Sequence, residues 1–160
     1  MRLRPATEKD IAWIVGQEAR ADMAAFIHRW PADRHRACLA DADYSYLIAE
    51  PGGGGVVGYL ILRGLGSAER SIELVRILAA EQGQGIGRFM LSAGKRFVFE
   101  ELAANRLWLD VFDDNERARR AYRAAGFVEE GLLRESCLRA DGRLGSLVII
   151  SILGREYENS

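Results

Sequence analysis

A glycine-rich run of six residues, QGQGIG, lies in the middle of the chain between Gln82 and Gly87. Glycine lets a backbone turn tightly and approach a ligand without interference from a Cβ atom. The run precedes a segment with helical periodicity, and the free N–H groups and the dipole at a helix start attract phosphate. The run therefore predicts a phosphate site, although the same glycines could serve only a tight strand-to-helix turn.

Two common phosphate-binding motifs do not fit this run. A P-loop requires Lys-Ser or Lys-Thr after its last glycine, and here Arg88 and Phe89 follow. The dinucleotide fingerprint requires G-x-G-x-x-G near the start of a βαβ unit, whereas this run reads G-x-G-x-G in mid-chain. Both interpretations are rejected.

A second group of polar residues lies downstream. Asn115 and Tyr122 are seven residues apart in a predicted helix, so both project from one face. A phenol has an ordinary pKa of about 10, so Tyr122 is protonated at neutral pH and can donate a proton. The alternative is that Tyr122 only packs the helix onto a sheet, because alanines at 118, 121 and 125 mark that side as buried.

Together these segments resemble the two cofactor motifs of the GCN5-related N-acetyltransferase (GNAT) superfamily. The first has the form Q/R-x-x-G-x-G/A, and the second, N-x-x-A-x-x-x-Y-x-x-x-G-F, runs from Asn115 to Phe127. The similarity covers roughly residues 44–130. It implies an enzyme that transfers an acetyl group from acetyl-CoA to a primary amine by direct attack, without a metal or a covalent intermediate.

The resemblance also implies roles for individual residues. Main-chain groups of Ile77, Leu78 and Ala79 would pair with the pantetheine arm of the cofactor. The Asn115 side chain would bind this arm from the opposite wall of the cofactor cleft. Tyr122 would protonate the departing thiolate. The pyrophosphate would be bound by backbone amides of Gln82, Gly83, Gln84, Gly85, Ile86, Gly87 and Arg88.

The general base is less sharply indicated. Glu73, on a predicted central strand, is the main candidate, acting through water, and Glu50 and Asp110 are alternatives. Each could equally be a solvated or paired carboxylate. Arg76 lies three residues from Glu73, so on a regular strand the two side chains are expected on opposite faces and not as a pair.

The resemblance links the segment that contains His28 and Trp30 to acceptor specificity. These two residues, and Tyr44 after the segment, are candidates for the acceptor pocket. His28 and His35 are seven residues apart across Pro31, a spacing that does not suit a metal site on a regular helix. A basic helix face could be merely solvated or could attract the adenosine 3′-phosphate of the cofactor. Its members are Arg117, Arg119, Arg120 and Arg123.

Alternation and helical periodicity place these residues on elements. Strands are expected at residues 2–5, 44–50, 56–62, 71–79, 107–112, 127–139 and 144–153. Helices are expected at residues 7–18, 86–101 and 116–125, with a helical region at 22–40 that is broken at Trp30-Pro31. A cap is expected at residues 113–115 and a hairpin turn at Asp141-Gly142. The fold class is α+β: a single mixed, mostly antiparallel sheet flanked by helices, with a central β-α-β acetyl-CoA-binding core.

Composition limits the other possibilities. The 160 residues fit one domain, with 22 basic and 23 acidic residues and a net charge of -1, which gives no support to nucleic-acid or membrane binding. No signal peptide or membrane span is evident. The two cysteines, Cys38 and Cys137, are expected to be reduced thiols in a cytoplasmic protein.

The acceptor stays open at this point. The C-terminal segment from Gly131 to Leu153 resembles the subgroup that acts on ribosomal-protein termini, polyamines or small amines, and a homodimer is a family-level expectation. Two other functions are weighed against the enzyme: a non-catalytic acyl-CoA-binding regulatory module on the same fold, and a nucleotide-phosphate binder.

Overall fold

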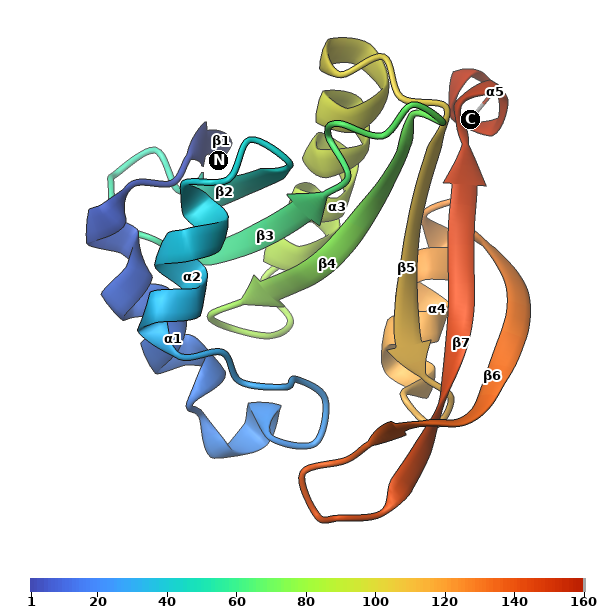
Figure 1. The fold of residues 1–160 in the computed structure, drawn as a ribbon. Coiled ribbons are helices and arrows are strands. Elements are labelled where there is room, and N and C mark those ends of the chain that lie inside the picture. Colours follow the sequence, from blue (N-terminus) through green and yellow to red (C-terminus); the bar gives the residue numbers. More distant parts are fainter. Residues whose placement is uncertain (160) are drawn as a thin grey trace.

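One mixed sheet of seven strands forms the centre of the computed structural model, which describes residues 1–159 (Figure 1). The strand order across the sheet is β1-β2-β3-β4-β5-β7-β6. The strands are β1 (Arg2–Pro5), β2 (Tyr44–Glu50), β3 (Gly58–Arg63), β4 (Ser71–Ala79), β5 (Arg106–Phe112), β6 (Val128–Leu138) and β7 (Leu144–Leu153). The α-helices are α1 (Ile11–Glu18), α2 (Ala32–Leu39), α3 (Ile86–Arg96), α4 (Glu116–Ala124) and α5 (Gly154–Glu158).

The expected fold class is confirmed. Every neighbouring pair in the sheet is antiparallel except β4 and β5, which are parallel and connected through α3. Three short turns complete the order: η1 (Glu8–Asp10), η2 (Ala21–Met23) and a π-helical turn, η3 (Phe97–Glu101), that continues α3. Helix α5 was not expected from the sequence.

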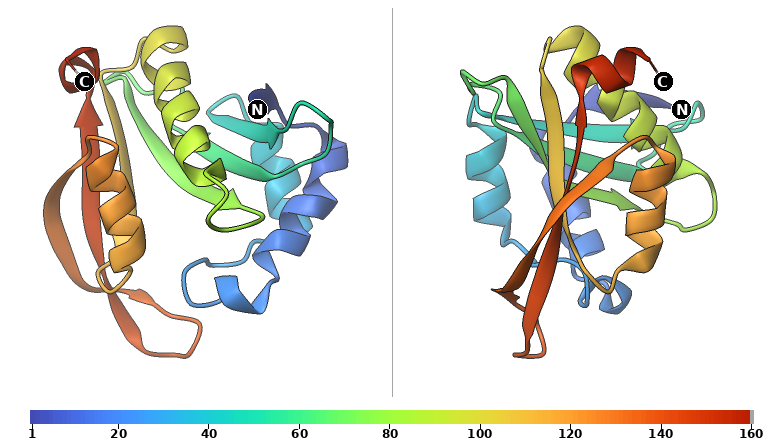
Figure 2. Two further views of the ribbon diagram at one scale, coloured as in Figure 1. Left: turned by 180° about the vertical axis from the view of Figure 1, so that it is seen from behind. Right: turned by 90° about the vertical axis from the view of Figure 1, so that its right-hand side faces the viewer.

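The helices cover opposite faces of the sheet. Figure 2 shows α1 and α2 on one face and α3 and α4 on the other. Side chains alternate along each strand, so β3 sends Tyr59 and Ile61 toward α1 and α2, and Leu60 and Leu62 toward α3. Two apolar cores result, one on each side of the sheet.

The parallel strands β4 and β5 pair over only a short stretch. Their register consists of Ser71 with Arg106, Ile72 with Leu107 and Glu73 with Trp108. Beyond that point the two strands separate toward their C-terminal ends (Figure 1). The edge of β4 that faces β5 is therefore left without a strand partner after Glu73.

A β-bulge in β4 corrects one expectation. Ile61 of β3 is opposite Arg76, but the next residue, Leu62, is opposite Leu74, so Val75 is an extra residue in β4. An extra residue shifts the alternation by one. Glu73 and Arg76 consequently share the face covered by α1 and α2, and the prediction of opposite faces was wrong. They still do not pair with each other, since Glu73 binds Arg63 and Arg76 binds Glu18.

The predicted helical region 22–40 is only partly helical. Helix α2 begins at Ala32, directly after Pro31, whose fixed φ and missing N–H suit a helix start. Before it lie only the short turn η2 and a stretch without regular structure that includes His28 and Trp30. The predicted hairpin turn is confirmed by a positive φ of 84° at Gly142 between β6 and β7, and Gly126, which follows α4, also has a positive φ, 90°.

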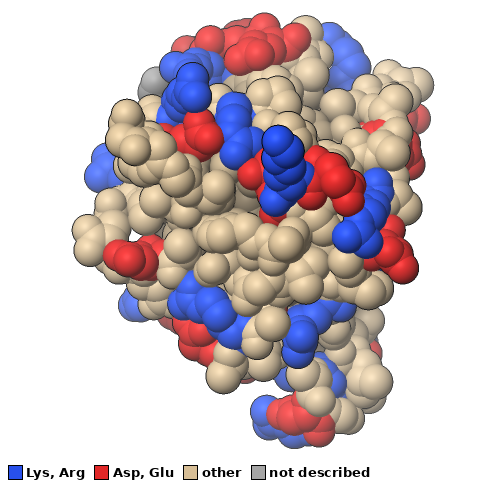
Figure 3. Space-filling view, turned by 90° about the vertical axis from the view of Figure 1, so that its left-hand side faces the viewer, with Lys and Arg blue, Asp and Glu red and all other residues tan. Residues whose placement is uncertain are grey.

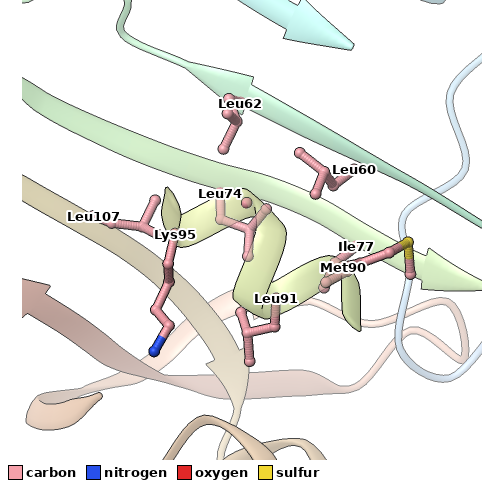
Figure 4. Close-up of a pocket in the computed structure, with 9 residues that line it drawn as sticks. Leu60, Leu62, Leu74, Ile77, Met90, Leu91, Lys95 and Leu107 are labelled. Carbon is pink, nitrogen blue, oxygen red and sulfur yellow. The ribbon is translucent and has the colours of Figure 1, made fainter. Parts of the chain in front are cut away.

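A small apolar cavity of about 10 Å³ lies between α3 and the sheet (Figure 4). This volume holds about one water molecule, and its lining is apolar, so it is a packing gap and not a ligand site. Lys95 places its aliphatic stem along this gap and donates from Nζ to the carbonyl oxygen of Ala125 at 2.7 Å. The interaction ties α3 to the C-terminal end of α4, where a cation is favourable.

Candidate functional site

The glycine loop between β4 and α3 opens outward. Gly83 and Gly85 have left-handed φ angles of 81° and 73°, and Gly85 is the N-cap of α3. A Cβ atom built at Gly83, Gly85 or Gly87 would meet no protein atom within 4 Å. The N–H groups of Ile86, Gly87 and Arg88 have no partner within the helix, because they belong to its first turn.

Gly87 distinguishes the two interpretations of this loop. A tight turn explains glycine at positions 83 and 85, where φ is positive. Gly87 has no positive φ and no close neighbour, and in a helix it is less favourable than alanine by as much as about 1 kcal/mol. The turn alone therefore does not account for Gly87, and close approach of a ligand to the backbone does.

The free edge of β4 and the start of α4 both adjoin this loop. Asn115 is the N-cap of α4, and its Oδ1 accepts from the Ala118 N–H at 3.3 Å, which confirms the predicted cap. Its side-chain amide nitrogen forms no hydrogen bond within the part of the chain that the structure describes. The Arg117 guanidinium donates to Oε1 of Gln82 and so joins α4 to the glycine loop.

Tyr122 shows features of both roles weighed for it. Its ring packs at 5.7 Å and 62° against Phe127 in the core beneath α4. Its hydroxyl, however, has no hydrogen-bond partner among residues 1–159. Burial, and after it the negative charge of Asp110, raises the pKa of Tyr122 to about 12, so the phenol stays protonated at neutral pH.

The three carboxylates considered as bases lie in different surroundings. Glu73 accepts from Nε of Arg63 at 2.8 Å, and burial raises its pKa despite this partner. Asp110 lies on β5 with its side chain accessible to solvent, and partial desolvation of its carboxylate by the surrounding protein raises its pKa. Glu50 is ion-paired with Arg2 and Arg4 between β1 and β2, at the edge of the sheet, so it does not lie near the point where β4 and β5 separate.

A buried polar network centres on Glu18, at the end of α1. Its side chain is 1% exposed and accepts from the Tyr59 hydroxyl at 2.6 Å, from the Trp30 N–H at 3.0 Å and from Arg76. His35 Nε2 lies 3.4 Å from Glu18 Oε1. This network was missed, although one signal was present: Ile11, Ile14 and Glu18 follow helical spacing, which places a carboxylate on the apolar face of α1.

The segment before α2 contacts β4 and also β5 and β6, which lie on either side of the point where β4 and β5 separate. Arg76 donates to the His28 carbonyl oxygen at 2.9 Å, and His28 Nε2 lies 3.1 Å from Sγ of Cys137 on β6. The His28 ring also contacts Phe112 at the end of β5, at 6.3 Å between centroids. His28 thus lies beside the ends of β5 and β6. Trp30, by contrast, is 8% exposed and packs in the core.

Most of the remaining candidates have defined partners. Tyr44 lies opposite Arg63 in the β2–β3 register. On the basic face of α4, Arg119 and Arg123 are ion-paired with Glu129 and Glu116. Both cysteines are free thiols.

On the face that carries α1 and α2, Lys and Arg side chains are intermixed with Asp and Glu side chains around a band of residues that carry neither charge (Figure 3). In residues 1–159, no group of three potential ligands is arranged to hold a metal ion. No helix in this range is long and apolar enough to cross a membrane.

The fold matches solved structures over its whole length. Spermidine N-acetyltransferase from Vibrio cholerae, crystallised with CoA and spermine, has a TM-score of 0.89 with 23% identity, over 99% of this chain and 98% of that one. A chimera of the same Vibrio cholerae enzyme and hSSAT has a TM-score of 0.88 with 23% identity, over all of both chains.

Curated relatives match a shorter segment. Spermidine N(1)-acetyltransferase of Vibrio cholerae is 31% identical over 105 residues, which is 65% of this chain and 60% of that protein. N-alpha-acetyltransferase RimI of Mycobacterium tuberculosis is 31% identical over 108 residues, 66% of this chain and 65% of that protein. The aligned region thus spans less than two thirds of each relative.

The model of the acetyltransferase (GNAT) family matches residues 13–127, a segment that includes the glycine loop, Asn115 and Tyr122. The resemblance inferred from the two motifs is confirmed, and the chain belongs to the GNAT acetyltransferase family.

Proposed function

We propose that this protein transfers an acetyl group from acetyl-CoA to a primary amine. The observation that carries the proposal is the separation of β4 from β5 after Glu73. It leaves free backbone N–H and C=O groups on β4 between the glycine loop and Tyr122, and an extended chain can pair with such an edge. Acetyl-CoA fits here because its pyrophosphate suits the loop amides and its pantetheine arm suits the strand edge.

Each residue then has a defined task. Amides of residues 82–88 bind the pyrophosphate, and main-chain groups of Ile77, Leu78 and Ala79 pair with the arm, with Asn115 opposite. Glu73 removes a proton from the attacking amine through a water molecule. Tyr122 donates its proton to the departing thiolate. Much of the rate comes from holding the amine and the thioester in contact.

The names of the relatives support an amine acceptor, since they describe enzymes that acetylate spermidine or α-amino groups. The acceptor proposed here is a small amine, a polyamine or a protein N-terminus. We further propose that residues 1–160 form a single domain that acts in the cytoplasm, without nucleic acid, and that it forms a homodimer.

Thiol release from acetyl-CoA across a panel of alkylamines, polyamines, aminoglycosides and peptide N-termini tests this function. We expect release with a subset of these amines, accompanied by one acetylated product per thiol. Calorimetric titration with acetyl-CoA and with ATP should show binding of acetyl-CoA alone. Tight acetyl-CoA binding with no thiol release from any amine would instead identify a non-catalytic acyl-CoA-binding module.

A further inference from the structure

Three carboxylates lie on the α1/α2 face near the point where β4 and β5 separate, and their partners differ. Glu18 is buried and fully bonded, and Glu73 is ion-paired with Arg63. Asp110 forms no hydrogen bond and no ion pair with any residue in the described range 1–159. It is the one carboxylate of the three whose charge has no direct partner.

The register of β5 places Asp110 at the opening of the gap. Trp108 is the last β5 residue paired with β4, opposite Glu73. Asp110 is two residues further along, on the same face and about 6–7 Å beyond the last pair. Phe112, two residues beyond it on that face, contacts His28. The Asp110 side chain is exposed, so a small molecule can reach it.

The charged and titratable groups that interact electrostatically with Asp110 come from four segments of the chain. They are Arg63 of β3, Glu73 of β4, Tyr122 of α4 and His28 from the segment before α2. Arg63 is already occupied by Glu73. Although the side chain stays accessible to solvent, partial desolvation by the surrounding protein raises the pKa of Asp110 more than Arg63 and His28 lower it.

We propose that Asp110 binds the ammonium form of the acceptor and thereby selects acceptors that are protonated primary alkylamines; this rests on the proposed acetyl transfer. An alkylamine has a pKa near 10, so it arrives as a cation. Such a cation supplies the positively charged partner that Asp110 lacks, and Asp110 holds it beside Tyr122. Asp110 is thus a specificity-determining residue, distinct from Glu73 and its role as base.

The proton and bond changes balance. The ammonium held by Asp110 gives up a proton through water to Glu73, and the neutral nitrogen forms a bond to the thioester carbonyl carbon. The carbon–sulfur bond breaks as the sulfur takes the proton of Tyr122. After the attack the nitrogen carries one proton more than the amide holds, and it gives that proton through solvent to the tyrosinate, which restores the phenol. Glu73 releases the proton that it accepted to solvent, which restores its carboxylate.

Binding to the non-reacting CoA-bound protein tests the proposal independently of turnover. The probes are a linear primary alkylamine, charged at neutral pH, and a hydrazide of similar length, whose terminal nitrogen is uncharged. We expect the wild type to bind the alkylamine about 10- to 100-fold more tightly, the range for a hydrogen bond to a charged group. Asp110→Asn should lose this preference, and Asp110→Glu should restore part of it.

Matched variants separate the role of Asp110 from a general charge effect. Glu101→Gln removes one negative charge from the exposed end of η3 and should keep the preference. No preference in the wild type, or a preference that persists in Asp110→Asn with an unchanged melting temperature, would overturn the proposal. If the preference is present but no amine is acetylated, the proposed transfer fails and the amine site stands.

Discussion

Two regions, the proposed acetyl-CoA side and the proposed amine side of the site, are constructed in different ways. The acetyl-CoA side consists of two short segments, the glycine loop and the start of α4, and its ligand groups are largely backbone amides. The amine side is assembled from α1, the segment before α2, β3, β4, β5 and β6. Its contacts join residues far apart in sequence: Arg76 reaches Glu18 across 58 positions, and His28 reaches Cys137 across 109.

The difference shows which part of a site is specified by residues that are close together in the sequence. A backbone phosphate site needs only glycines and a helix start, so consecutive residues specify it. A pocket made of side-chain charges needs the whole fold to bring its members together. Substitutions should therefore change ligand binding more than folding stability on the acetyl-CoA side, and should change folding together with binding on the amine side.

The largest effect is expected for Glu18→Gln, on the amine side. Removing one partner of a buried ion pair leaves the Arg76 charge uncompensated, at a cost of about 3–5 kcal/mol in the free energy of unfolding. Urea denaturation measures this loss. Glu8→Gln is the control, because the Glu8–Arg36 ion pair is exposed and such pairs contribute little.

The pH dependence of stability adds a second measurement on Glu18. Burial alone would raise its pKa, but His35, Arg76 and Tyr59 together outweigh burial and lower it. The stabilisation is therefore complete above the unfolded pKa of about 4.3 and is lost as pH falls toward the folded pKa. Glu18→Gln should flatten the acid side of the stability curve, and an unaltered slope would contradict the network.

The next largest effect is expected for Gly85→Val, on the acetyl-CoA side. A side chain there extends into the open space where the pyrophosphate is proposed to bind, and we expect a loss of about 100-fold in acetyl-CoA affinity by calorimetry. Gly54→Val is a matched control, because Gly54 has a φ of 85° and equally open surroundings in the β2–β3 turn. Equal affinities in both variants would remove the phosphate site from this loop.

The same division explains what the sequence alone predicted. The order of the strands, the β4-α3-β5 core and the Asn115 cap follow from periodicity, glycines and capping residues, which act locally. The extra residue at Val75 was not predictable, since a bulge is a feature of the pairing between two strands, and it reversed the expected face of Arg76. Glu50 failed as a candidate for a similar reason: its partners, Arg2 and Arg4, lie 48 and 46 positions earlier in the sequence, on the neighbouring edge strand β1, and only the fold shows that they pair with it.

Tyr122→Phe tests whether helix α4 takes part in catalysis as well as in acetyl-CoA binding. The variant keeps the ring against Phe127 and removes only the hydroxyl, so acetyl-CoA affinity and the melting temperature should stay close to wild type. Turnover should fall by about 100-fold or more, the contribution of a general acid. Phe127→Leu makes the opposite change and should lower stability more than turnover. Normal turnover in Tyr122→Phe would leave Tyr122 with a packing role alone.

The smallest effect, and the sharpest test of the comparison, is expected for Gly87→Ala. The added Cβ meets no protein atom within 4 Å, and alanine favours a helix, so α3 should gain from a few tenths to about 1 kcal/mol. If Gly87 is present for close approach of the pyrophosphate, acetyl-CoA affinity should fall by about 10-fold in the same variant. Gly16→Ala, in the exposed part of α1 with equally open surroundings, should gain stability without losing affinity. A gain in stability with a loss of acetyl-CoA affinity at Gly87, and a gain in stability alone at Gly16, would show that ligand binding and not folding requires glycine at position 87. A gain in stability with unchanged affinity at both positions would support the tight-turn interpretation of Gly87.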